Sequence, residues 1–224
     1  MMKIFGKKKK ALPKIHWKDI TIARHKAILK VYEKYRGDED NLAFLYDLCA
    51  AAYGKDEEWI NGLQISEANE WVNSMAFLNE RLKPAMVKSE YWLGGHRYKL
   101  TMNFQEVSTL QYIEFQQMAE HSADMPAEFL SIILIPYGKT YGEGYDISQV
   151  VYDIENYMSV EDCLGMRAFF LTLLKISTRR SLRKLGKLEA KARKEGLMSE
   201  EQLQALHRVR VLLESVSGTK RSTP

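Results

Sequence analysis

The chain has 224 residues, of which 46% are hydrophobic and 28% charged, and its formal net charge is +4. This composition supplies enough apolar material for a folded core and excludes a chain that is disordered throughout. The two cysteines, Cys49 and Cys163, are too few for a secreted disulfide framework and too far apart for a zinc-ligand pair. The apolar runs are far shorter than the roughly 20 residues that a membrane span needs. We therefore expect a chain of the reducing cytoplasm without a membrane segment or a signal peptide.

The net charge is divided unevenly along the chain. Residues 1–18 carry seven lysines and no acid, and residues 175–194 carry nine basic residues against Glu189 alone. Residues 195–224 are balanced, which leaves −11 for residues 19–174. An acidic body between basic segments predicts contact with nucleic acid or with another copy of the chain. A solvated tail and a solvated helix face are the alternative.

The first part of the chain shows helical periodicity. Residues 1–14 lack it and are predicted to form a flexible arm. Helices are expected over residues 19–35, 38–53 and 66–83, with Asp38 and Ser66 as N-caps and Gly37 and Gly54 as stops.

The period changes after residue 88. Residues with high β propensity stand on both sides of Gly94 and Gly95, so we expect a hairpin over about 88–102, and it is the only strand pair that the sequence predicts. A lone hairpin is marginal in water. It must therefore pack on helices or join a strand of a neighbouring subunit.

Helical periodicity returns after Ser108. Helices are expected from there to 119, from Pro126 through Leu134 at the centre of the core, from Asp146 to Tyr157 and from Val160 to Glu195. A last helix begins at Ser199 and is expected to pair with the long one. The predicted fold is mainly α, with a basic N-terminal arm (1–18), an acidic helical body carrying the hairpin (19–174), a basic antiparallel helical hairpin (175–217) and a frayed tail (218–224).

No motif in the sequence predicts catalysis. The triplet 138–140 (GKT) resembles part of a phosphate loop, but Ile133 stands where that loop needs a glycine. Among the histidines, His121 has a carboxylate at close range, on Asp124, and none has metal-ligand spacing to another histidine or a cysteine. Cys163 falls in a first helical turn, where a thiolate is favoured, and a buried structural thiol is the alternative. We expect no enzyme, no catalytic residue, no cofactor site and no metal site.

Two sets of residues are candidates for contact with partners. The basic set, for a subunit or for nucleic acid, comprises Lys7, Lys8, Lys9, Lys10, Arg179, Arg180, Arg183, Lys184 and Lys187. Tyr and Trp bury much area at little entropy cost, which favours them at interfaces. The aromatic set, expected at a subunit interface or in packing of the hairpin on the glycine loop, comprises Tyr91, Trp92, Tyr98, Tyr137 and Tyr141.

Three apolar stretches carry a resemblance to a known class of proteins. They are residues 110–115 (LQYIEF), 135–141 (IPYGKTY) and 168–171 (AFFL). Residues 100–180 resemble small virion-module proteins of tailed phages, namely the head-to-tail ring or adaptor proteins of crAss-like phages of gut Bacteroides and tail-assembly-chaperone-like proteins. No functional residue of these proteins carries over to this chain.

The resemblance implies a helical, non-catalytic structural subunit of a virion. Such a subunit forms a homo-oligomeric ring or head-tail connector, contacts other virion structural proteins and is assembled in the cytoplasm of the bacterial host. Two alternatives remain open at this point. One is a tail-assembly chaperone that is absent from mature particles, and the other is a nucleic-acid-binding protein that uses the basic arm and the basic helix.

Overall fold

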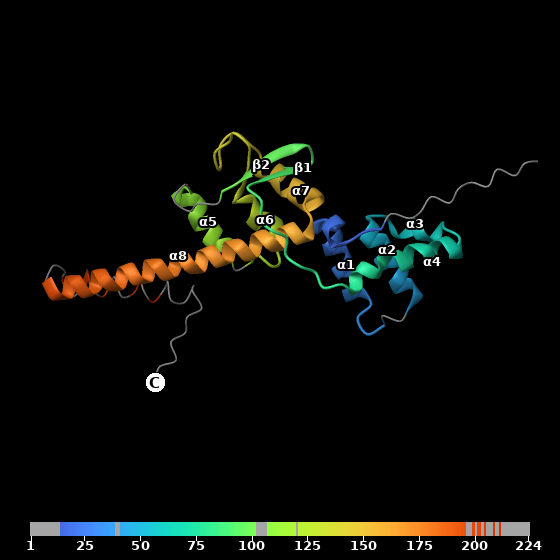
Figure 1. The fold of residues 1–224 in the computed structure, drawn as a ribbon, viewed down its shortest axis with the longest axis horizontal. Helices are drawn as coiled ribbons and strands as arrows, with labels where there is room; N and C mark the ends of the chain where they lie inside the picture. The colour runs from blue at the N-terminus through green and yellow to red at the C-terminus, as the bar shows by residue number, and fades with distance from the viewer. Residues whose placement is uncertain are drawn as a thin grey trace, which may run out of the picture. The chain divides into compact units, whose positions relative to one another are not determined.

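The computed structural model describes residues 14–38, 41–101, 107–119, 121–195, 199, 201–202, 204, 208 and 211 (Figure 1). It confirms the mainly α fold with a small antiparallel sheet. The chain divides into two compact units, Met1–Arg167 and Ala168–Pro224.

The first unit begins with short helices that lie together in Figure 1. They are η1 (Trp17–Asp19), α1 (Ile22–Lys34), α2 (Leu42–Tyr53), α3 (Glu57–Asn61), α4 (Ile65–Asn73) and η2 (Ser74–Asn79). They surround one apolar cluster built from Ile20, Ile28, Phe44, Leu48, Cys49, Ala52, Tyr53, Ile60, Ala68, Met75, Phe77 and Val160.

Two predicted N-caps in this region are wrong. The side chain of Asn41, not Asp38, caps α2 by accepting from the Ala43 N–H, while Asp38 accepts from the Asn41 amide. Helix α4 starts one residue before Ser66, because the Glu67 carboxylate accepts from the Gln64 N–H and closes the first turn there. The predicted stop at Gly54 is confirmed, since this residue has the left-handed conformation with φ +63°.

The sheet contains the predicted hairpin and a third strand that the sequence did not predict. Strands β1 (Glu90–Leu93), β2 (His96–Leu100) and β3 (Leu134–Pro136) pair antiparallel in the order β1-β2-β3. The helix expected through Leu134 ends at Ser131 instead, because Leu134 and Ile135 pair with Leu100 and Lys99. A short apolar run fits a buried helix and a buried strand equally well, so periodicity alone did not separate them.

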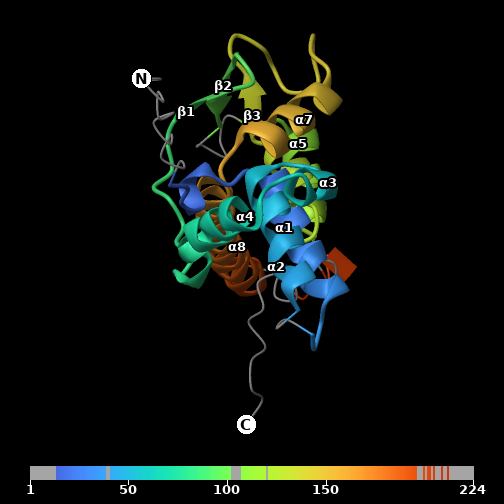
Figure 2. The same ribbon diagram turned by 90° about the vertical axis from the view of Figure 1, so that its right-hand side faces the viewer.

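Three further helices belong to this region, and Figure 2 shows the last of them, α7, beside β3. They are α5 (Thr109–Ala119), α6 (Pro126–Ser131) and α7 (Ile147–Tyr157). The predicted caps Ser108 and Asp146 are confirmed, because their side-chain oxygens accept from the N–H groups of Gln111 and Ser148. Among the residues described, no helix has both the length and the apolarity to cross a membrane.

The two halves of the first unit are joined where α7 gives way to α8 (Val160–Glu195). The Val160 N–H donates to the Ile20 carbonyl over 2.8 Å, and the Ile22 N–H donates to the Met158 carbonyl over 3.2 Å. Strand-like pairing of residues 20–22 with 158–160 therefore ties the start of α1 to the start of α8.

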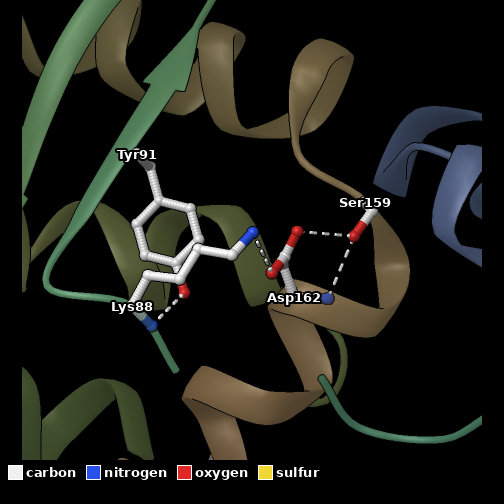
Figure 3. Close-up of polar contacts among 4 residues, drawn as sticks. All are labelled: Lys88, Tyr91, Ser159 and Asp162. Atoms are coloured by element: carbon white, nitrogen blue, oxygen red, sulfur yellow. Dashed lines mark hydrogen bonds and ion pairs between the residues drawn. The ribbon is translucent and has the colours of Figure 1, made fainter. Parts of the chain in front are cut away.

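The extended segment 81–88 is fastened to the same place (Figure 3). Ser159 caps α8 by accepting from the Asp162 N–H over 3.1 Å and donates its hydroxyl to the Asp162 carboxylate. The other oxygen of this carboxylate pairs with Lys88 Nζ at 3.3 Å, and the Lys88 N–H donates to the Tyr91 hydroxyl. One carboxylate therefore links the helix cap to the entry of β1.

Helix α8 has the predicted bounds, Val160–Glu195. The predicted start of the last helix is supported by reciprocal bonds, from the Gln202 N–H to Ser199 Oγ and from the Ser199 N–H to Gln202 Oε1. Most of that helix, its predicted pairing with α8 and the tail lie outside the described residues, as does most of the predicted N-terminal arm.

Candidate functional site

The two faces of the hairpin differ in chemistry. Side chains alternate across a strand, so Tyr91, Leu93, Tyr98 and Leu100 point inward and are buried. Trp92 and Arg97 are directly paired across the strands on the opposite face, and Trp92 is 71% exposed. The Arg97 guanidinium lies 3.9 Å from the ring centroid of Tyr137, whose side chain is also exposed. We call Trp92, Arg97 and Tyr137 the exposed sheet face.

Arg97 is held in place on this face. Its Nε and Nη2 both donate to Glu90 Oε2, over 3.0 and 2.7 Å. The hydrogen bond to Glu90 raises the pKa of Arg97, so the guanidinium stays charged at any working pH. A charged guanidinium that is fixed by Glu90 and lies over the Tyr137 ring is a pre-organised surface for contact.

Strand β1 has an open edge. The order β1-β2-β3 leaves one side of β1 without a partner strand among the residues described. In an antiparallel pair, alternate residues direct their N–H and C=O groups toward the neighbouring strand. The Leu100 N–H donates to the Ser89 carbonyl, so the backbone groups of Glu90 and Trp92 point to the open side. This edge is a template for one further strand.

The inward face is centred on Asp153 of α7, which is 1% exposed. Its Oδ2 accepts from the Tyr98 hydroxyl at 2.6 Å and from His96 Nδ1 at 2.7 Å. Its Oδ1 accepts from Gln149 Nε2 at 2.8 Å. Burial raises the pKa of Asp153, but the bonds from Tyr98, His96 and Gln149 outweigh it, and the pKa lies below its ordinary value. The hairpin is therefore anchored to α7 through an ionised carboxylate.

The hairpin approaches α7 closely at Gly94. A Cβ there would lie 2.7 Å from Tyr157 Cε2 and 2.9 Å from Asp153 Oδ1, and the residue has φ +57°. Only glycine meets both requirements at this position of the turn. The turn residue and the Asp153 anchor thus serve the same contact.

A groove of about 440 Å³ opens beside this anchor. Its lining includes His96, Arg97, Tyr137, Lys139, Tyr145 and Gln149. A His–Asp pair can serve as a general base for a neighbouring nucleophile. Serine, threonine and cysteine are not among the described residues that line this groove. Asp153 holds three donors at once, which is what an anchor between two elements requires.

The predicted aromatic set is split by the structure. Tyr91 and Tyr98 are 5% and 2% exposed and hydrogen-bonded within the chain, so the expectation that they lie at a subunit surface is corrected. Trp92 and Tyr137 are exposed, and each neighbours Arg97, Trp92 as its partner across the strands and Tyr137 through its ring. Tyr141 is half-buried in the glycine loop and donates to the Glu114 carboxylate. Burial and then this bond raise its pKa.

The predicted basic set is also divided. Lys7, Lys8, Lys9 and Lys10 lie outside the described residues. Arg179, Arg180, Arg183, Lys184 and Lys187 are all exposed on α8. No ion pair joins any of these five to the part of the chain that the structure describes.

Cys49 and Cys163 are buried free thiols, so the structural alternative for Cys163 is the one that the structure supports. Burial raises the pKa of both to about 12. At pH 8 only about one thiol in ten thousand is then ionised. We expect a thiol-disulfide reagent to modify neither within minutes in the native chain and both after unfolding in urea. Met86→Cys, at a position 86% exposed, should react at once, and rapid reaction of a native thiol would contradict the burial.

Asp153 is the residue of the candidate site that was not predicted from the sequence. A signal was present, because this charged residue falls between Val150 and Ile154 on the apolar side of its helix.

No group of His, Cys, Asp and Glu among the residues described could hold a metal ion. Comparison of the chain with protein-family models, with curated proteins and with solved structures finds no match. The candidate site therefore rests on the geometry of this chain.

Proposed function

We propose that the chain is a structural, non-catalytic subunit of a tailed-bacteriophage virion, and that it forms an oligomeric ring or adaptor in the head-to-tail region. The observation that carries this proposal is the exposed sheet face beside the open edge of β1. The resemblance of residues 100–180 to virion-module proteins gives the proposal its setting in a particle assembled in the host cytoplasm.

The exposed sheet face has the composition of an interface hot spot. Trp, Tyr and Arg are the residue types that most often dominate binding energy at protein interfaces. Here all three meet on one surface, and the neighbouring edge offers backbone groups that a second chain can pair with. A face used identically by every copy, against a different surface of its neighbour, closes into a ring when the rotation allows it.

The proposal is tested by the oligomeric state of the full chain. We expect the wild type to form a closed oligomer by multi-angle light scattering, and Trp92→Ser to weaken its association about 10–30-fold. Ile65→Ser removes another exposed apolar side chain, 75% exposed on α4, and should leave the oligomer unchanged.

Two outcomes would overturn the proposal. A wild-type chain that stays monomeric at high concentration does not form a ring through this face. A chain that is abundant in infected cells but missing from the mass spectrum of purified particles acts as an assembly chaperone and not as a virion subunit.

A further inference from the structure

The second half of α8 is a basic amphipathic helix. An α-helix turns by about 100° per residue. On this spacing seven basic residues fall within an arc of about 140°. They are Arg179, Arg180, Arg183, Lys184, Lys187, Lys191 and Lys194, and every one of them is exposed. We call this set the basic face of α8.

The basic face contains no acid. Glu189 lies on the opposite side of the helix, where Leu182 and Leu185 are only partly exposed and Thr178 is buried. No ion pair within the described part of the chain involves a member of the basic face. Within the described part of the chain the seven charges therefore lie along one helix face with no acid paired to them.

The spacing of these charges matches that of a nucleic acid strand. From Arg179 to Lys194 the helix rises about 22 Å, which is one positive charge per ~3 Å. A strand of duplex DNA carries one phosphate per about 3.4 Å of helix axis. Residues 19–174 of the chain itself carry a net charge of only −11, so their negative charge is far less dense than that of DNA. Charge complementarity thus favours a polyanion over a second copy.

We infer that the basic face of α8 binds the phosphates of duplex DNA without sequence preference. Binding of single strands relies on aromatic side chains on which bases stack, and residues 175–195 contain none. A bare α-helix also matches the major groove of B-form DNA in width. The inference goes beyond the proposed ring and does not depend on it, because it uses a different element.

The test is a salt titration with the full chain and a fluorescent DNA duplex of ~30 base pairs. Log affinity should fall with log salt by about 0.9 for each phosphate contacted. The triple variant Arg180→Gln, Arg183→Gln, Lys187→Gln should bind about tenfold more weakly or worse and have a slope smaller by about 2.7. Its helical content should match the wild type in circular dichroism, since Gln is a good helix former.

The matched control removes the same charge elsewhere. Lys18, Lys30 and Lys55 are exposed on the body, and their triple change to Gln should leave affinity and slope near the wild-type values. Equal losses in both variants, or no loss in the basic-face variant, would overturn the inference. So would binding to vesicles of anionic lipid but not to DNA, or preference for a single strand over the duplex. The oligomer test with Trp92→Ser is read independently of all these outcomes.

Discussion

Replacing Gly165 by alanine is expected to destabilise the first unit by ~2–4 kcal/mol. A Cβ at this position of α8 would lie 2.1 Å from the Ala85 carbonyl oxygen, a backbone atom that no rotamer change can move. The Ala85 N–H donates to the Glu161 carbonyl at 2.9 Å, so a shift of the segment also weakens this bond. The gain in helix propensity, about 1 kcal/mol, offsets only part of the loss. Urea unfolding followed by Trp fluorescence measures the change.

Gly186 provides the control on the same helix. Nothing lies within 4 Å of a Cβ built there, and its backbone is helical. Gly186→Ala should therefore leave stability unchanged or raise it by up to about 1 kcal/mol. If Gly165→Ala behaved like Gly186→Ala, the close passage of segment 81–88 over the start of α8 would be refuted.

The local structure of this chain was largely readable from its sequence. Caps and stops are set by near neighbours, so Ser108, Asp146 and Gly54 were assigned correctly, and α8 was given its full length. The wrong cap assignments are local competitions. Asn41 displaced Asp38 because a cap is decided by which side chain reaches the free N–H groups, and several polar residues stand in that loop.

What escaped prediction depends on contacts between distant residues. Gly165 is required because Ala85 passes over it, and Asp153 is ionised in the core because Tyr98 and His96 reach it from the hairpin. Periodicity carries no information on such encounters. The exposed sheet face was partly predictable from the sequence. Gly94 and Gly95 fix the register of the hairpin, and the alternation of side chains then places Trp92 on the outer face and Tyr91 on the inner face.

Replacing Asp153 by asparagine tests the anchor itself. The change keeps the shape but removes the charge, so the bonds from Tyr98 and His96 become neutral and weaker, and we expect a loss of ~1–2 kcal/mol at pH 7. The pKa of Asp153 is lowered in the folded chain, so the unfolded chain binds the proton first. The carboxylate's contribution is complete well above its ordinary pKa of 3.8 and is lost as the pH falls through the lower folded value.

The difference in unfolding free energy between wild type and Asp153→Asn should therefore shrink as the pH falls from about 5 to about 2. Asp124 is exposed, and Asp124→Asn should change stability by less than about 0.5 kcal/mol over the same range. A difference in unfolding free energy that stayed constant down to the lowest pH would show that the three hydrogen bonds to the Asp153 carboxylate do not lower its pKa. If Asp153 anchors the hairpin to α7, replacing it should loosen the hairpin alone. Amide exchange should become faster in β1 and β2 and stay unchanged in α1–α4, because the N-terminal helices have their own apolar cluster.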